Sequence, residues 1–184
     1  MRKLLIGMTF FAFGSTACAT VVQQPAPTGP ESPITVEIRL SDGSPAGRVT
    51  MLHGPQGVLL RIEGENWPQG WHGAHLHAVG TCEGPGFQSA GGHVNHPQTQ
   101  RPHGLLNFDG GPDHGDLQNV YAHADGVARA EVYLASPALA GDHGATNADG
   151  LALVIHASAD DHVTQPIGGA GARIACAVLI PAGS

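Results

Sequence analysis

The sequence predicts an all-β domain, an antiparallel sandwich or barrel of six to eight short strands. Charged residues make up only 12% of the chain, whereas it contains 27 glycines and 14 prolines. This composition suits short strands joined by many turns better than long surface helices. Apolar and polar residues also alternate in several short runs, and no stretch beyond the N-terminal leader shows a convincing helical period.

Each expected strand is a short alternating run. In chain order, the runs lie at 34–40 (ITVEIRL), 48–53 (RVTMLH), 57–65 (GVLLRIEGE), 123–134 (HADGVARAEVYL), 147–158 (NADGLALVIHAS) and 173–180 (RIACAVLI). Two of them, 123–134 and 147–158, place Asp-Gly directly before the alternating part, and Asp-Gly is the strongest short hairpin signal. The sequence therefore predicts a hairpin turn at each Asp-Gly pair.

One long segment does not follow this rhythm. Residues 80–119 are rich in glycine, proline, histidine and aspartate and contain few apolar residues. A connection of this length inside a compact domain is seldom idle. Because histidines also concentrate in it, we expect residues 80–119 to form a functional loop.

Residues 1–19 are typical of an export signal: MRK is basic, LLIGMTFFAFG is apolar but too short to remain as a membrane span, and STACAT offers small residues for cleavage. Two cleavage positions are open, before Cys18, where STAC resembles a bacterial lipobox, or after Ala19. Pairing of Cys82 with Cys176 would leave Cys18 as the one unpaired cysteine. Cys18 is the residue that would be lipidated if the lipobox were used. We expect the protein in the periplasm or another extracytoplasmic compartment, in contact with a membrane only through a lipid on Cys18.

The rest of the chain divides into a tether and one domain. Residues 20–33, TVVQQPAPTGPESP, are proline-rich and without apolar periodicity, so the folded domain is expected at 34–184. Beyond the leader, six arginines and no lysine face 15 carboxylates. A body this acidic excludes nucleic acid as a partner. Attraction for an anion must therefore be local, set by one well-placed arginine or by a metal.

The stretch GWHGAHLHAVGTC, Gly70 to Cys82, carries the strongest chemical signal. His75 and His77 are two apart on an expected strand, so both imidazoles point to the same face, whereas His72 has the other parity. Two imidazoles cannot complete a metal site and need partners from distant parts of the chain. The candidates are His93, His103, His114, Asp116 and His156. Neutral imidazoles suit copper and zinc, and carboxylates are common additional zinc ligands.

These motifs together resemble the copper–zinc superoxide dismutases of the bacterial exported type. The resemblance covers nearly all of 34–181 and depends on GWHGAHLHAVGTC, SAGGHVN, the HG at 103–104, DHGDLQN, LVIHASADD and GARIAC, which occur in the family order. It implies an eight-stranded antiparallel Greek-key barrel with a long metal-binding loop. The implied activity is dismutation of superoxide to dioxygen and hydrogen peroxide at a histidine-bound copper with an adjacent zinc.

The resemblance also implies roles for individual residues. The copper ligands would be His75, His77, His93 and His156, and zinc would share His93 and add His103 and Asp116. Asp160 would support one copper histidine and one zinc histidine, Arg173 would guide the anionic substrate beside the copper, and Cys82 would pair with Cys176.

The fourth zinc ligand is open, because the sequence departs from the family pattern there. The family spaces its bridging and next zinc histidine eight apart, but His93 and His103 are ten apart. The family also has a histidine three residues before Asp116, where this chain has Asp113, followed by His114. Either Asp113 or His114 completes the site, or zinc binds weakly or not at all.

Two functions therefore compete. The first is an exported superoxide dismutase, either a monomer or a homodimer, with Arg173 and His93 as its catalytic residues. The alternative is an exported copper- and zinc-binding module on the same fold without significant turnover. Arg173 favours the enzyme, since a storage module does not need an arginine beside an open copper position. Because residues 161–172 contain no lysine or glutamate, guidance of the anion is expected to depend on Arg173 and the copper centre.

Overall fold

Alternating sequence forms antiparallel strands throughout the domain, which confirms the all-β fold class. The structure, a computed structural model, describes residues 32–54, 57–95, 100–135 and 149–183. The expected signal peptide at 1–19, with Cys18, and all but the last two residues of the expected tether at 20–33 lie outside the described residues. None of the helical segments in the described ranges is long or apolar enough to cross a membrane.

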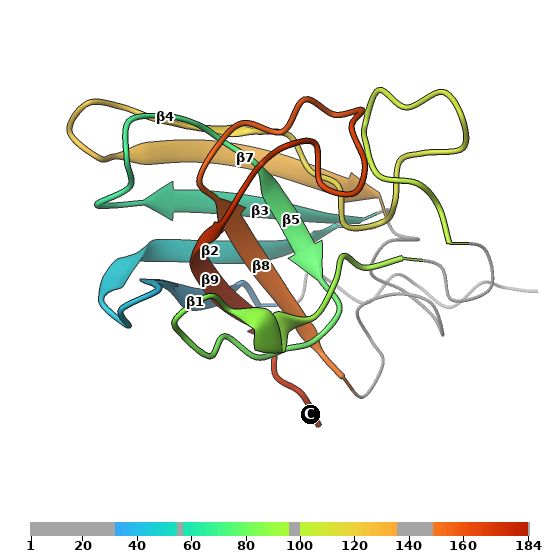
Figure 1. The fold of residues 1–184 in the computed structure, drawn as a ribbon. Helices are drawn as coiled ribbons and strands as arrows, with labels where there is room; N and C mark the ends of the chain where they lie inside the picture. Colours follow the sequence, from blue (N-terminus) through green and yellow to red (C-terminus); the bar gives the residue numbers. More distant parts are fainter. Residues whose placement is uncertain (1–31, 55–56, 96–99, 136–148, 184) are drawn as a thin grey trace, which may run out of the picture.

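The described residues contain nine strands (Figure 1). They are β1 (Ile34–Leu40), β2 (Pro45–Gly54), β3 (Gly57–Gly64), β4 (Gly70–His72), β5 (Ala74–His77), β6 (Val120–Ala122), β7 (Ala128–Ala135), β8 (Leu151–His156) and β9 (Arg173–Ile180). Four of the six expected runs contain one whole strand each, 48–53 lies within β2, and 123–134 contains most of β7. The short strands β4, β5 and β6 come from the histidine-rich stretch and from the end of the long loop.

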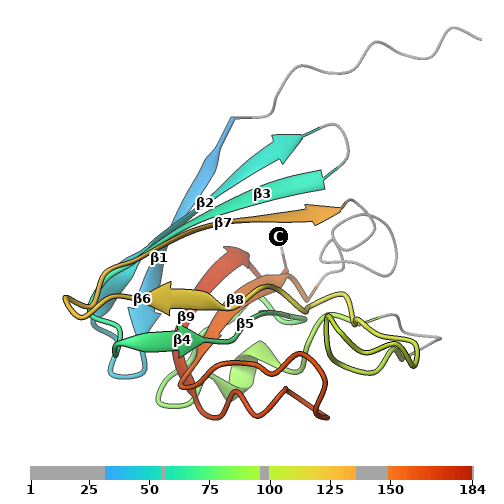
Figure 2. The same ribbon diagram turned by 90° about the horizontal axis from the view of Figure 1, so that it is seen from above.

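The nine strands form one sheet that curls into a nearly closed barrel (Figure 2). The strand order is β4-β6-β7-β3-β2-β1-β9-β8-β5, so β3 and β4 are separated by β7 and β6, a Greek-key type of crossing. β4 and β5 lie at opposite edges of the sheet although only Gly73 separates them in the chain. The expected count of eight differs from nine because Gly73 divides one continuous stretch, and its backbone bonds to His156 and Ser158 instead of to a strand neighbour of β4.

One of the two hairpin predictions is confirmed and the other is wrong. Asp125 and Gly126 form the turn between β6 and β7, with Gly126 at φ 78°. Asp149 and Gly150 form a turn that leads into β8, but β8 pairs with β5 on one side and β9 on the other. Both edges of β8 are therefore occupied. The segment that directly precedes the Asp149-Gly150 turn has no free edge of β8 with which to form a hairpin.

The barrel interior takes residues, mostly alternate ones, from every strand except β4. β5 contributes Ala74 and Leu76 to this core, and β8 contributes Leu151, Leu153 and Ile155. Nevertheless, every residue of β5 and β8 is buried, so their outer faces are covered as well. The covering layer consists of the described parts of the loops 78–119 and 157–172, which lie side by side over this part of the barrel (Figure 1).

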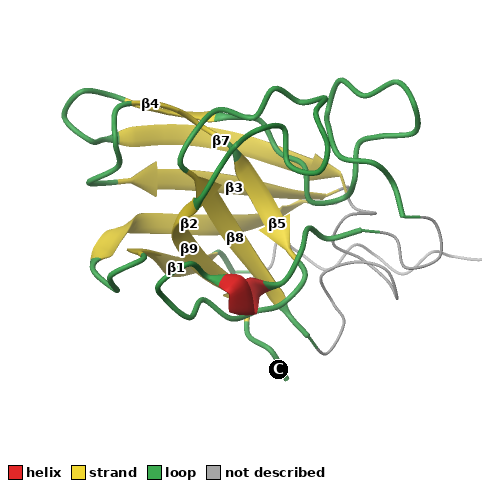
Figure 3. Ribbon diagram, in the orientation of Figure 1, coloured by secondary structure: helices red, strands yellow, loops and turns green. Residues whose placement is uncertain are grey.

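The long loop is confirmed, and its described part contains only one short 3-10 helix, η1 (Gln88–Ala90), beside β8 (Figure 3). The Cys82–Cys176 disulfide is also present and joins this loop to β9. The bond closes a separation of 94 residues, which corresponds to a stabilisation of ~4–5 kcal/mol in the chain-entropy account of disulfides. The loop is therefore held against the outer face of β8 and β9.

Candidate metal centre

Three histidines share the outer face of the β5–β8 strand pair. His75 and His77 alternate with the core residues Ala74 and Leu76, as their parity predicts. His156 ends β8 on the side opposite the core residue Ile155. Since β5 and β8 are paired in antiparallel register, the three imidazoles lie on adjacent strands and are each no more than 1% exposed.

The free edge of β5 brings in the remaining ligands. β5 pairs with β8 on one side only, so the backbone groups of its other edge need partners. Leu76 donates its N–H to the carbonyl of Gly115 and accepts one from Val94, at 2.8 and 2.9 Å. These contacts place His93 opposite His77 and Asp116 opposite His75 in isolated bridges.

Four imidazoles then surround one point. His75, His77, His93 and His156, hereafter the all-histidine group, each offer a ring nitrogen within 4.8 Å of the others. The facing nitrogens have no hydrogen-bond partner and are His75 Nδ1, His77 Nε2, His93 Nε2 and His156 Nε2. Four buried lone pairs directed at one another repel unless a cation lies between them, so the group fits a bound metal ion.

The opposite ring nitrogens are fixed by the protein. His77 Nδ1 donates to the carbonyl of Gly91 and His156 Nδ1 to that of Gly171, both at 2.9 Å. His75 Nε2 donates to Asp160 at 2.7 Å. A hydrogen bond at one nitrogen sets the tautomer and leaves the other nitrogen as a ligand.

A second group shares His93 with the first. His93, His103, Asp113 and Asp116, hereafter the mixed group, also lie within 4.8 Å of one another through their ligand atoms. His93 Nδ1 is 2.9 Å from Asp113 and 3.6 Å from Asp116, and His103 Nδ1 is 2.5 Å from Asp116. Two nitrogen and two carboxylate donors in a buried pocket suit zinc.

Asp160 connects the two groups from behind. Its carboxylate accepts from His75 Nε2 and from His103 Nε2, at 2.7 and 3.1 Å. Asn119 fixes the backbone of Asp160, since its side-chain amide donates to the Asp160 carbonyl and accepts the Asp160 N–H, each at 2.8 Å. Sequence analysis missed Asn119 as a positioning residue, although it ends the DHGDLQN motif.

The structure also decides where the other candidates lie. His114 belongs to none of the ligand groups found among the described residues and lines a separate cavity behind Asp113. His72 lies away from both groups, as its parity predicts, with its ring nitrogens 2.7 Å from the carbonyls of Pro68 and His156. The structure thus brings Asp113, and not His114, to the mixed group.

The two groups differ in their affinity for protons. Burial lowers the pKa of His75, lowers that of His77 to about 2 and lowers that of His156 to about 4. His77 and His156 therefore stay neutral and available to a metal well below pH 6.5. Like-charge repulsion from neighbouring histidines adds to the effect of burial.

The mixed group has the opposite behaviour. Burial alone would lower the pKa of His103, but Asp116 and Asp160 outweigh it and raise this pKa to about 10. Asp113 and Asp116 likewise raise the pKa of His93 above its ordinary value. Burial would raise the pKa of Asp116 and Asp160, and the histidines hold both well below the usual range. A proton on His103 therefore supplies the charge that a metal ion would bring.

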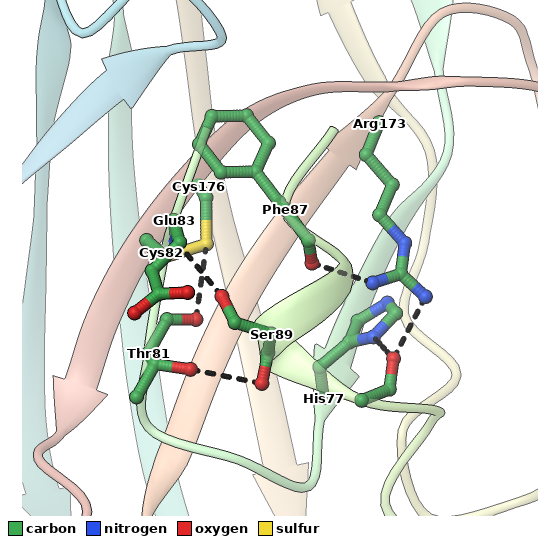
Figure 4. Close-up of a disulfide and its surroundings, with 9 residues drawn as sticks. His77, Thr81, Cys82, Glu83, Phe87, Ser89, Arg173 and Cys176 are labelled. Atoms are coloured by element: carbon green, nitrogen blue, oxygen red, sulfur yellow. Dashed lines mark hydrogen bonds between the residues drawn. A yellow bond between two sulfur atoms is a disulfide. The ribbon is translucent and has the colours of Figure 1, made fainter. Parts of the chain in front are cut away.

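Arg173 stands beside the all-histidine group and is held by the disulfide loop (Figure 4). It follows the last loop into β9, opposite His156 in the strand register. Its guanidinium donates to the carbonyls of Phe87 and Gly91, each at 2.7 Å, and Gly91 also accepts from His77. Arg173, His77, His93 and His156 line one cavity of about 550 Å³.

Comparison with known proteins agrees with this arrangement. The sequence profile described as copper/zinc superoxide dismutase (SODC) matches residues 45–179. A superoxide dismutase [Cu-Zn] from Caulobacter vibrioides is 49% identical over 148 residues, which cover 79% of this chain and 84% of the relative. Superoxide dismutase [Cu-Zn] 1 from Aquifex aeolicus is 37% identical over 142 residues, 74% of this chain and 81% of the relative.

Solved structures show the same fold. A superoxide dismutase-like protein from Bacillus subtilis superposes with a TM-score of 0.70 at 30% identity, over 79% of this chain and 97% of its own. The Cu/Zn superoxide dismutase from Brucella abortus superposes with a TM-score of 0.62 at 28% identity, over 80% of this chain and 99% of its own.

The composition of the mixed group predicts which substitution removes zinc. Asp113→Asn is expected to weaken zinc binding by about one to two orders of magnitude, because a carboxylate is lost from the group. His114→Gln is expected to leave zinc binding within about twofold. Zinc affinity measured by competition with a chromophoric chelator checks this. Loss of zinc in His114→Gln with retention in Asp113→Asn would contradict the assignment.

Two neighbouring glycines give a matched test of Asp160. Both Gly168 and Gly169 have positive φ, at 60° and 69°, so alanine strains the backbone at each. Only at Gly168 would a Cβ overlap the Asp160 carboxylate; at Gly169 it meets nothing within 4 Å. Gly168→Ala should therefore lower metal affinity about tenfold or more, whereas Gly169→Ala should only lower the melting temperature slightly. Equal metal affinities in the two variants would be evidence against the role of Asp160.

Opposite pKa shifts predict a bell-shaped stability profile for the metal-free protein. Below pH 6.5 the unfolded chain protonates His77 and His156 while the folded protein does not, so the free energy of unfolding falls as the pH falls towards 4. Above pH 6.5 folded His103 keeps a proton that the unfolded chain releases, so the free energy of unfolding falls again as the pH rises towards 10. Each differing proton contributes up to about 1.4 kcal/mol per pH unit.

Urea unfolding of the chelator-treated protein at pH 4.5, 6.5 and 9 measures this profile. His103→Gln should flatten the alkaline side, and His123→Gln, which lies outside both groups, should not. A metal-free protein whose stability is the same at pH 6.5 and 9 would show that His103 does not hold the proton.

Proposed function

Because the chain belongs to the copper/zinc superoxide dismutase family, we propose that it dismutes superoxide to dioxygen and hydrogen peroxide at a histidine-bound copper with an adjacent zinc. The observation that carries the proposal is the set of four unpartnered ring nitrogens in the all-histidine group, beside a second group that shares His93. A storage site needs neither a shared imidazole nor a guanidinium at its open side.

The ligand assignment follows the chemistry of the donors. The all-histidine group would hold copper and the mixed group would hold zinc, with Asp113 as its fourth ligand. When bound, copper would supply one-electron oxidation and reduction of superoxide, and zinc would supply positive charge next to the shared imidazole. The described residues orient these donors before any metal arrives, through the hydrogen bonds of His75, His77 and His156.

His93 is the residue suited to move a proton. Its Nε2 faces the other members of the all-histidine group and has no hydrogen-bond partner. Its Nδ1 faces the carboxylates of the mixed group. A proton can therefore be held at Nε2 while Nδ1 stays engaged on the other side. The carboxylates that raise the pKa of His93 favour this protonation. Peroxide formation needs protons, and Nε2 is directed to where the substrate would bind.

Arg173 is the residue suited to hold the anion. Two of its N–H groups are used by the carbonyls of Phe87 and Gly91, which fixes the guanidinium plane at the cavity. The guanidinium lines the cavity and is only half-buried, so its positive charge faces the space that an anion would enter. A fixed charge of this kind stabilises an anion without reorganisation at the moment of reaction.

We further propose that the chain is exported. If the lipobox directs cleavage, Cys18 is the site of lipid attachment. Support comes from the sequence of residues 1–19 and from a disulfide, which persists in oxidising compartments. The protein would then meet superoxide outside the cytoplasm, as a monomer or a homodimer.

Activity and metal content measured on the same sample test the proposed function. The copper- and zinc-loaded protein is expected to catalyse dismutation. Arg173→Gln should keep both metals and lose on the order of tenfold to a hundredfold in kcat/KM. Arg61→Gln, which removes the same charge from an exposed pair with Glu131, should change kcat/KM less than about twofold. Fully loaded protein without turnover would leave the metal-binding module as the function.

The intact mass of the protein purified from cells tests export. Lipidation at Cys18 gives a chain that begins at Cys18 with added acyl mass, and cleavage after Ala19 gives one that begins at Thr20. Cys18→Ser should abolish only the lipidated form. Accumulation of the full 184-residue chain in the cytoplasm would contradict export.

A further inference from the structure

The two loops that cover β5 and β8 hold each other through side-chain amides. Asn119, which ends the loop 78–119, binds both the N–H and the carbonyl of Asp160 in the loop 157–172. Gln165 binds the backbone of His103 in the opposite direction. Its Oε1 accepts the His103 N–H at 2.9 Å, and its Nε2 donates to the His103 carbonyl at 2.8 Å. Each loop therefore holds one residue of the other by both backbone groups.

A carboxamide is suited to this contact because it carries an acceptor and a donor side by side. It can pair with both backbone groups of one residue, much as a neighbouring strand does in an antiparallel sheet. Residues 100–119 before β6 and 157–172 are irregular, so no continuous strand ladder supplies these bonds. His103 is only 3% exposed, and buried backbone groups need partners. Gln165 thus replaces a strand neighbour for His103.

The loop 157–172 holds His103 at two points. The ring is held by Asp160, whose carboxylate accepts from His103 Nε2 at 3.1 Å. The backbone is held by Gln165. Asn107, from the same loop as His103, adds one bond from its Nδ2 to the His103 carbonyl at 3.0 Å. With backbone and ring both fixed, His103 Nδ1 stays directed at Asp116 in the mixed group.

Gln165 itself is an exposed residue, in contrast to the histidine that it holds. Its Nε2 also donates to the carbonyl of Val163 at 3.0 Å, which orders the side chain within its own loop. A substitution at Gln165 therefore removes the contact to His103 without opening a cavity in the core. None of the sequence motifs assigned a role to this residue.

We propose that Gln165 is a positioning residue of the mixed group, which fixes the backbone of His103 against the loop that carries Asp160. Gln165 belongs to neither ligand group and acts through His103. The proposal rests on the proposed function for the identity of the metal, zinc. Loss of a residue that orients a metal ligand lowers metal affinity by about 10- to 100-fold. Because Gln165 is exposed and water competes for its bonds, we expect the lower end of this range.

The first test measures zinc affinity by chelator competition, with copper already bound in the all-histidine group. Gln165→Met keeps the length of the side chain but loses both hydrogen bonds, and should lower zinc affinity on the order of tenfold. Gln88→Met is the matched control, since Gln88 is also exposed but its amide donates to the carbonyl of Gly86. The control should stay within about twofold of the wild type. Gln165→Asn, one methylene too short to reach both backbone groups, should behave like Gln165→Met.

A second measurement distinguishes positioning from a general effect on stability. Cobalt(II) in the mixed group absorbs visible light according to its ligand geometry, so Gln165→Met should change this spectrum and Gln88→Met should not. Hydrogen exchange followed by NMR should also show faster exchange of the His103 N–H in Gln165→Met alone. If Gln165 only stabilised the fold, the melting temperature would fall while zinc affinity and the cobalt spectrum stayed those of the wild type.

The outcomes separate this proposal from the proposed function, because none of these measurements needs turnover. A wild type that binds both metals without dismuting superoxide, but whose zinc affinity depends on Gln165, would remove the proposed function and support the positioning role. Equal zinc affinities and equal cobalt spectra in Gln165→Met and Gln88→Met would overturn the positioning role, whatever the activity. A wild type that binds neither zinc nor cobalt in the mixed group would overturn it as well.

Discussion

The structure depends on one electrostatic constraint, the mutual repulsion of buried acceptors that face each other at the outer side of β5. Two groups of four side chains share His93, the ligand atoms of each group lie within 4.8 Å of one another, and most of these atoms are shielded from water. Such a cluster is stable only with positive charge between its members. Protons supply that charge in the mixed group, where the pKa of His103 is raised to about 10, but not at His77 and His156, where burial lowers the pKa to about 2 and about 4.

This difference gives the two groups separate roles. Burial lowers the pKa of His75, His77 and His156, so these imidazoles are available to a metal without first losing a proton, whereas the pKa of His93, which belongs to both groups, is raised. The mixed group must release protons when a metal enters, so its occupancy follows pH more closely. Asp160 joins the groups, because one carboxylate orients His75 and His103 at the same time. Both groups therefore depend on one buried side chain, and Asn119 fixes the backbone of that residue.

Backbone hydrogen bonds and one disulfide turn a long loop into a rigid support. The free edge of β5 is covered by residues of the loop 78–119, which removes an exposed edge and positions His93 and Asp116. The disulfide holds the same loop against β9, and the carbonyl of Gly91 then serves both His77 and Arg173. His77 and the Arg173 guanidinium therefore contact one anchored segment, which fixes both side chains at the cavity.

Much of the fold could be predicted from the sequence because it depends on local periodicity, whereas the assignment of most metal ligands depended on the resemblance to a known family. Alternation determined the strands and put His75 and His77 on one face, opposite Ala74 and Leu76. Sequence could not predict that Asp149-Gly150 lacks a hairpin, since the pairing of β8 with β5 and β9 depends on contacts far apart in the chain. Nor could it predict the division of the histidine-rich stretch at Gly73, where the backbone bonds to the segment after β8.

The sequence by itself determined which donors are present and which of them share a strand, because side-chain direction in a strand follows parity. Only the tertiary structure decided which distant donors meet. Asp113 joins the mixed group and His114 does not, although they are adjacent, because the loop backbone at the edge of β5 directs one of them inward. The same holds for His103, whose backbone is held by a contact with Gln165 that no local pattern encodes.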